Sequence, residues 1–330
     1  MLNARICVAF LALIAGVSAV ADMTFANRAF SLVIGDDATV KSLKLANSYK
    51  ECVEAREGTP LFTVTQNRPF NNEIKLAHMH KRTAYRANRI RRDGDNLIVG
   101  FELAPYEAVV SVSVRPSYME FKLDRFIVDA GDYGDLKMDT PPVDSFRIMQ
   151  IPVLDRANFG EWINAVWDWE CAVGVIGTSC ETYVDNEERH GFRLLTADLV
   201  RGRRLRGGSA VLVASSGPDT FLDAVECVEK DYSLPQGVKS RRSSLINASM
   251  FWICDMTPKN VDNYIALAKQ AGVKMMLLYY TCFVKETDSW GYNGDWDILP
   301  DYPGGLADVT AMLAKIKAAG IHTRKEQICK

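Results

Sequence analysis

The chain of 330 residues has few histidines and almost no net charge. It contains 4 histidines, and 39 lysines and arginines oppose 41 aspartates and glutamates, for a formal net charge of -2. Neither a CxxC pair nor an HExxH motif occurs. The sequence therefore predicts no metal site and no cofactor. The balanced charge also argues against nucleic acid as a partner, and the basic stretches 89–92 and 201–206 are expected to be solvated.

Long apolar runs are absent beyond the first residues. Arg5 precedes an apolar run over residues 6–17, and small residues at 19–21 come before Asp22. This order predicts a signal peptide, residues 1–21, that is cleaved before Asp22. A membrane anchor is the alternative, but the run is shorter than the ~20 residues a spanning helix needs. The mature protein is thus expected to be secreted or periplasmic, with no membrane partner after cleavage.

The cysteine count does not fit a complete disulfide framework. Eight cysteines occur and Cys7 lies in the signal segment, so an odd number remains in the mature chain. Cys171 and Cys180 can pair if a hairpin brings them together, and the sequence leaves this open. Cys254 lies in an apolar run and is expected to pack as a small apolar side chain.

Residues 22–238 are predicted to form an antiparallel β-sandwich. Short apolar runs alternate with turn residues at a spacing typical of such a fold. These runs are residues 30–34, 83–89, 97–103, 109–114, 119–128, 162–177, 192–199 and 210–214. A long loop is predicted over 129–160 and a helix over 219–230. The polar stretch 239–248 is predicted to be a linker.

The hydrophobic periodicity changes after residue 248. Residues 249–254 and 273–280 are continuous apolar strands, and a third strand begins at 321. Thr257-Pro258 predicts the start of one helix, a second helix begins near 306, and Gly272 and Gly320 follow the two helices. Apolar strands alternating with helices predict a parallel sheet. Residues 249–330 are therefore predicted to be the first two to three βα units of an incomplete (β/α)8 barrel.

The segment from Trp252 to Thr323 in this second part resembles a known family, especially in one aromatic loop. The segment Trp290-Gly-Tyr-Asn-Gly-Asp-Trp296, followed by Pro303-Gly-Gly-Leu306 and a helix ending Ala318-Ala-Gly-Ile321, resembles the start of the catalytic TIM barrel in α-galactosidase-like glycoside hydrolases of families 27, 31 and 36. A β-sandwich ahead of the barrel is typical of families 31 and 36.

The resemblance implies a retaining α-glycosidase, in which two carboxylates about 5 Å apart act as nucleophile and acid/base. In these families they lie on the fourth and sixth barrel strands. Because this chain reaches only the third strand, the resemblance implies that the catalytic residues lie beyond Lys330. It also implies that the chain is an inactive fragment of a secreted enzyme acting on α-linked glycans.

The resemblance also indicates residues that bind an oligo- or polysaccharide. Asp255 follows the first strand of the predicted barrel, where it can accept from a sugar hydroxyl or merely favour a helix N-terminus. Trp290, Tyr292 and Trp296 can stack on a sugar ring with Asp295 accepting from its hydroxyls, or pack the loop onto its own barrel. The next strand ends in Tyr279-Tyr-Thr-Cys282 where galactosidases usually carry Asp-Asp and Trp, which argues against a strict α-galactosidase.

Four further residues have a structural and a functional interpretation. His322 is expected to be a hydrogen-bonded core residue rather than part of the barrel mouth. Trp167 and Trp169, spaced to share one strand face, are expected with Trp162 to form core and interface rather than a binding platform. The alternative functions are a non-catalytic protein that binds glycans through its sandwich and a polysaccharide lyase.

Overall fold

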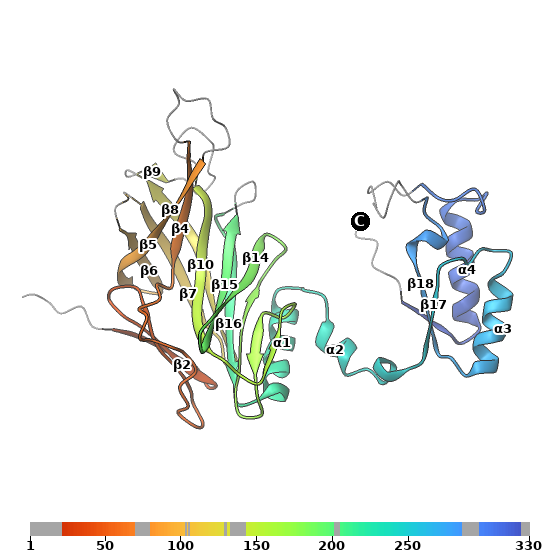
Figure 1. Cartoon of the computed structure of the whole chain (residues 1–330), viewed down its shortest axis with the longest axis horizontal. Helices are drawn as coiled ribbons and strands as arrows, with labels where there is room; N and C mark the ends of the chain where they lie inside the picture. The colour runs from red at the N-terminus through yellow and green to blue at the C-terminus, as the bar shows by residue number, and fades with distance from the viewer. Residues whose placement is uncertain are drawn as a thin grey trace, which may run out of the picture. The chain divides into compact units, whose positions relative to one another are not determined.

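The structure, a computed structural model, describes residues 22–69, 80–102, 104, 106–128, 131–132, 143–200, 205–285 and 297–324. The predicted signal peptide lies outside this set. The chain divides into two compact units, residues 1–238 and 239–330 (Figure 1). Within the described ranges no helix is long and apolar enough to cross a membrane.

The first unit is built almost entirely from antiparallel strands. A small sheet contains β1 (Met23–Ala26), β2 (Phe30–Ile34) and β3 (Val40–Leu45). The strands of a large 13-stranded sheet are, in spatial order, β11 (Asn158–Gly160), β12 (Ala165–Trp167), β13 (Ala172–Gly177), β16 (Ser209–Ser215), β8 (Tyr118–Val128), β7 (Tyr106–Val114), β6 (Asn96–Phe101), β5 (His80–Asp93), β4 (Thr63–Pro69), β10 (Val143–Leu154), β15 (Phe192–Val200) and β14 (Thr182–Arg189), with β9 (Gly131–Asp132) beside β8.

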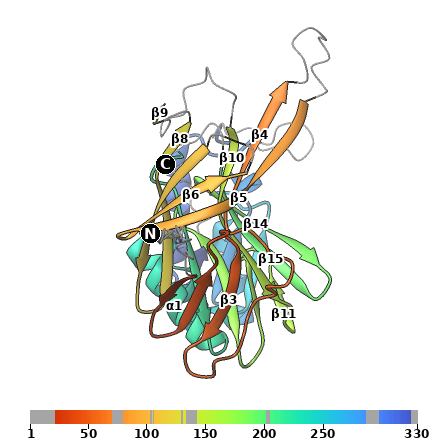
Figure 2. The same cartoon turned by 90° about the vertical axis from the view of Figure 1, so that its left-hand side faces the viewer.

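The large sheet curls where β5 changes partners. Residues 80–86 of β5 pair with β4, and Ala87 onwards pairs with β6. The register shifts between Ala87 and Arg89, so Asn88 forms a β-bulge, which bends and twists a strand. The two arms of the sheet face each other, because β10 contacts β8, β13 and β16 without being their neighbour (Figures 1 and 2). The predicted sandwich requires two separate sheets of similar size, whereas the described strands from β4 to β16 form one continuous curled sheet, with β1, β2 and β3 in a small sheet of their own.

Aromatic side chains fill the space between the two arms. The ring of Phe146 on β10 lies 6.2 Å from Phe62, 6.2 Å from Phe101 on β6 and 5.8 Å from Phe126 on β8, measured between centroids. All four side chains are buried. Phe146 therefore joins strands that are far apart in the order of the sheet.

The prediction of a long loop over 129–160 is wrong, because β10 occupies its second half. Val143–Leu154 is buried on both faces, so it has none of the alternation that marks a half-exposed strand. It also contains Pro152, a residue that argues against a sheet interior because it lacks an N–H. Here the carbonyl of Pro152 accepts from the N–H of Glu54 at 2.8 Å, which ties β10 to the segment after β3.

The predicted helix over 219–230 is confirmed as α1 (Pro218–Asp231). Contrary to the prediction, Trp162 and Trp169 do not belong to the core, since 98% and 90% of their surfaces are exposed, and their part in an interface stays a prediction. Strand β12 ends at Trp167, so Trp169 lies in the following turn and does not share its face.

The second unit begins with the helical turns α2 (Gly237–Arg241), of which the last three residues belong to this unit, and η1 (Ser244–Asn247). Its strands β17 (Met250–Ile253), β18 (Met275–Leu278) and β19 (His322–Arg324) pair in parallel. Helices α3 (Val261–Ala271) and α4 (Leu306–Ala318) and the short turn η2 (Tyr280–Cys282) connect them. The strand–helix alternation expected for residues 249–330 is thus observed.

Helices α3 and α4 lie on one side of this parallel sheet (Figure 1). The buried cluster between sheet and helices comprises Ile253, Met276 and Leu278 from the strands and Val261, Ile265, Ala268, Val309, Met312 and Ile316 from the helices, among others. The opposite face carries Met250 and Trp252, both exposed. One apolar face of the sheet is therefore covered and the other is open.

Two local predictions in this unit are corrected. Helix α3 begins at Val261 with Asn260 as its N-cap, not at Thr257-Pro258, because the side chain of Asn260 accepts from the N–H of Thr257 at 2.7 Å and closes a turn ahead of the helix. Cys254 is exposed and not packed, because β17 ends at Ile253.

Replacing Phe146 by alanine is predicted to lower the free energy of unfolding of the first unit by about 3–5 kcal/mol, the usual cost of removing a buried phenylalanine. Urea unfolding followed by hydrogen exchange in peptides of β8 and β10 measures this. Tyr183→Ala on β14, an exposed ring, is the control and should change stability by about 0.5 kcal/mol or less. Equal losses in the two variants would contradict the role given to Phe146.

Candidate functional site

The loops that follow β17 and β18 are fastened together at the carboxyl edge of the parallel sheet. The buried hydroxyl of Tyr302 lies 2.7 Å from the carbonyl oxygen of Met256 and 2.9 Å from that of Cys282. Its single hydrogen satisfies one of these acceptors at a time. The Cys282 thiol donates to the carbonyl of Ile253 at 3.1 Å, and burial raises the pKa of this thiol to about 11. These hydrogen bonds hold the two loops in fixed positions at the carboxyl edge.

Asp255 lies in the loop after β17, and its carboxylate is exposed to solvent. Its Oδ1 accepts from the hydroxyl of Tyr264 on α3, and its backbone carbonyl accepts from Nδ2 of Asn260 at 3.0 Å. The hydrogen bond to Asp255 is the main reason that the pKa of Tyr264 is raised to about 12. Within the described part of the chain, Oδ2 of Asp255 accepts no hydrogen bond, so it is oriented and available to a ligand hydroxyl.

The helix-dipole interpretation of Asp255 is weak in this geometry. The field of a helix N-terminus is felt mainly within the first turn. Helix α3 begins at Val261, and the acidic residue in its first turn is Asp262. Asp255 lies well ahead of that turn, which leaves ligand binding as the role that its exposed carboxylate suits. That role stays a prediction.

An aromatic row lies on the open face of the sheet and was missed by the sequence analysis. The ring of Trp252 on β17 is 5.9 Å from that of Tyr279, which is 4.5 Å from Tyr280. Trp252 is 62% exposed. The alternation of side chains along a strand could have identified it, because Trp252 must point to the face opposite the partly buried Phe251 and the buried Ile253.

The remaining predicted site residues are only partly covered by the structure. Trp290, Tyr292, Asp295 and Trp296 lie outside the described residues. His322 is described, and the prediction that it is a core residue is wrong: it lies opposite Met275 in the register of β18 and β19 and is exposed. His322 is therefore the solvent-exposed first residue of β19.

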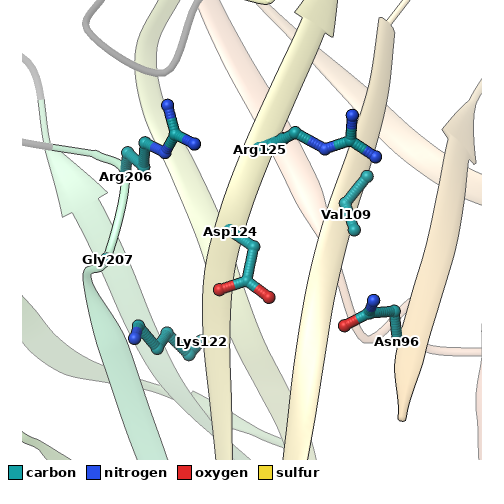
Figure 3. A pocket seen from close by; sticks show the side chains of 7 residues that line it. All are labelled: Asn96, Val109, Lys122, Asp124, Arg125, Arg206 and Gly207. Carbon is teal, nitrogen blue, oxygen red and sulfur yellow. The ribbon is translucent and has the colours of Figure 1, made fainter. Parts of the chain in front are cut away.

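The first unit has a separate polar hollow of about 400 Å³ on its large sheet. A second bulge explains how it forms: the register of β7 and β8 shifts at Asp124, which brings Lys122, Asp124 and Arg125 to one surface. Arg206, from the turn before β16, borders the same hollow (Figure 3). Three cationic side chains and one carboxylate thus line this hollow.

Exposed tryptophans are a further feature of the first unit. Trp162 lines an apolar hollow of about 340 Å³ together with Val225 and Leu234, among others. Trp169 lies in the turn between β12 and β13. Large exposed apolar rings of this kind are frequent at binding surfaces.

No cluster of three or more His, Cys, Asp or Glu side chains that could hold a metal ion is found where the chain is described.

In the comparisons with known proteins, matches come from solved structures. No protein-family model matches the sequence, and no curated protein matches it. Solved structures do match, and they include glycoside hydrolases of families 36 and 31, two of the families named above, as well as a polysaccharide lyase.

Three of these structures have the following similarity to this chain. A family 36 α-galactosidase from Geobacillus stearothermophilus is 10% identical with a TM-score of 0.47, over 93% of this chain and 55% of that one. An α-N-acetylgalactosaminidase from Bifidobacterium bifidum is 10% identical with a TM-score of 0.44, over 91% and 58%. A family 31 sulfoquinovosidase from E. rectale is 11% identical with a TM-score of 0.39, over 91% and 47%.

The chain therefore spans about half the length of the structures that it matches. Because all three TM-scores are 0.47 or lower, the likenesses establish neither an activity nor a substrate for this chain.

Replacing Tyr302 by phenylalanine is predicted to destabilise the second unit by about 1–3 kcal/mol, because buried carbonyl oxygens lose their donor. Thermal unfolding of the full chain, monitored by hydrogen exchange in peptides covering residues 253–285, measures the loss. Tyr279→Phe removes a hydroxyl from the half-buried aromatic row and should be nearly neutral. A neutral Tyr302→Phe would show that the two loops are held by packing alone.

Proposed function

We propose that this chain is part of an exported glycoside hydrolase acting on α-linked glycans. In this proposal residues 249–330 supply the first strands of a (β/α)8 barrel, and the curled sheet of the first unit takes the place of the preceding β-sandwich domain. The residues at 1–21, with their signal-peptide order, support export. N-terminal sequencing of the exported protein, which should begin at Asp22, checks that part.

The observation that carries the proposal is the exposed, oriented carboxylate of Asp255 at the carboxyl end of β17. In (β/α)8 enzymes the active site lies at that end of the strands. Tyr264 holds one oxygen of Asp255 by a hydrogen bond, so binding a ligand hydroxyl at the other needs little rearrangement. On the same sheet Trp252 offers a flat apolar face, which suits the apolar C–H groups of a sugar ring.

The reaction that the proposal assigns is retaining hydrolysis. It needs one carboxylate to attack the anomeric carbon and a second, about 5 Å away, to protonate the leaving oxygen and then activate water. Asp255 is proposed as a substrate-binding residue and not as a member of that pair. Its carboxylate, with one oxygen held by the hydroxyl of Tyr264, suits binding a sugar hydroxyl and orienting the sugar ring. Trp290, Tyr292, Asp295 and Trp296 are proposed to contribute from the loop after β18.

Asp255→Asn is predicted to weaken binding of an α-linked oligosaccharide by about ten- to a hundredfold, the equivalent of one hydrogen bond to a charged group. Calorimetric titration of the full chain with maltotetraose and with raffinose measures this, and β-linked cellotetraose serves as the ligand control. Trp290→Ala and Trp296→Ala are expected to weaken binding to a similar degree with little change in melting temperature.

The matched control variant is Asp219→Asn, which removes an exposed carboxylate from the first turn of α1 in the other unit. It should leave binding unchanged. Unaltered affinity in Asp255→Asn, Trp290→Ala and Trp296→Ala together would contradict a sugar site at this edge, whereas a lower melting temperature without a loss of affinity would indicate packing roles.

A second candidate function is glycan binding by the first unit without catalysis. It is favoured by the exposure of Trp162 and Trp169 and by the polar hollow formed by Lys122, Asp124 and Arg125. Planar and charged side chains of this kind are suitable hydrogen-bond partners for sugar hydroxyls or for acidic sugar groups. If this function holds, Trp162→Ala, Trp169→Ala or Arg125→Ala lowers the affinity in the same titrations and Asp255→Asn does not.

A further inference from the structure

Two cysteines from distant parts of the first unit meet in its core. Cys52 and Cys171 are separated by 119 positions, yet their Sγ atoms lie 3.4 Å apart. Both side chains are fully buried in the main apolar cluster. Cys52 follows the small sheet, whereas Cys171 stands next to β13 of the large sheet, so the two sulfur atoms span the boundary between these sheets.

The backbone holds each cysteine in place. The N–H of Cys52 donates to the carbonyl of Leu43 at 2.8 Å, and the carbonyl of Cys52 accepts from the N–H of Leu154 at 2.9 Å. The N–H of Cys171 donates to Oδ1 of Asp168 at 2.8 Å, which closes a tight turn ahead of β13. These hydrogen bonds fix the two backbone segments that carry the cysteines.

The surroundings favour a thiolate on one member of the pair. The hydrogen bond from Cys52 is the largest influence that lowers the pKa of Cys171, and the nearby guanidinium of Arg156 acts in the same direction. The Arg156 side chain is 8% exposed and is paired with Asp168 at 3.3 Å. A thiolate is the species that attacks disulfides.

The pairing of Cys171 with Cys180 that the sequence left open does not fit this geometry. Strand β13, Ala172–Gly177, extends for about 20 Å between the two residues at ~3.3 Å per residue. Bridged cysteines have Cα atoms within about 7 Å. Cys180, Cys227 and Cys254 are exposed, and the thiol of Cys282 donates to Ile253 in the other unit.

We propose that Cys52 and Cys171 form a disulfide bond that fastens the small sheet to the large sheet when the chain folds with a low-molecular-weight disulfide such as oxidised glutathione. One of the two cysteines attacks, as a thiolate, one sulfur of the small disulfide, whose S–S bond breaks and releases one thiolate. The other cysteine then loses its proton to solvent and its sulfur attacks the mixed disulfide at the first cysteine, releasing the second thiolate. The two cysteines lose two electrons and two protons, and the small disulfide is reduced to two thiols.

Burial of the two cysteines decides when the disulfide can form and how stable it is afterwards. Because both cysteines are inaccessible in the folded unit, the exchange takes place while the fold is still open, and the finished bond is shielded from reductants. The bond closes a long loop and so restricts the unfolded chain. The first unit is expected to melt about 5–15 °C higher with the bond than without it. The inference is independent of the proposed function.

The test is peptide mapping of the full chain after refolding with oxidised and reduced glutathione. Remaining thiols are alkylated with iodoacetamide in denaturant, and the chain is digested with trypsin without reduction. Trypsin places Cys52 in peptide 51–56, and Cys171 with Cys180 in peptide 157–189. The Cys180→Ser variant removes the ambiguity and is also the matched control.

The expected result is that peptide 51–56 is linked to peptide 157–189 in the wild-type chain and in Cys180→Ser. Dithiothreitol during refolding should lower the melting temperature of both by the stated amount and should not change that of Cys52→Ser. Alkylation of Cys52 and Cys171 in the refolded wild-type chain would overturn the proposal, and so would a link that persists in Cys171→Ser. The link is read in the wild-type chain, so the test does not depend on the variants folding.

Discussion

Burial of the Phe146 ring between the two arms of the large sheet is the contact on which the first unit depends. The bulge at Asn88 allows β5 to pair with β4 on one arm and with β6 on the other, and the resulting curl brings β10 over β8. The rings of Phe62, Phe101 and Phe126 then fill the enclosed space. The polar hollow and the exposed tryptophans occupy the outside of a scaffold that this packing holds in shape.

The second unit follows a different rule, in which one face of a short parallel sheet is covered and the other is open. Helices α3 and α4 bury Ile253, Met276 and Leu278, while Trp252 remains in solvent. Tyr302 and Cys282 fasten the loops beyond β17 and β18, so Asp255 stands on a fixed edge. The hydrogen bonds of these two buried side chains thus help to position the exposed carboxylate of Asp255.

Sequence patterns predicted the helices and strands that bury one face only, and those whose ends are marked by glycine or proline. Strand β2 and helix α1 fall where periodicity places them, and Gly272 caps α3 with a positive φ of 70° as a residue after a helix often does. The prediction failed at β10, which is buried on both faces and contains Pro152. It failed again at Trp162 and Trp169, where the strand was too short for alternation to apply. The contact between Cys52 and Cys171 depends on the fold of the whole unit and has no local signal.

The central claim is that ligand binding belongs to the carboxyl edge around Asp255. Hydrogen–deuterium exchange of the full chain at saturating maltotetraose or raffinose tests this directly, because a bound ligand slows exchange in the backbone that it orders. We expect slowed exchange in peptides covering residues 253–265 and 279–285, with residues 118–128 and 205–209 unchanged. Slowed exchange confined to residues 118–128 and 205–209, around the polar hollow of the first unit, would contradict it.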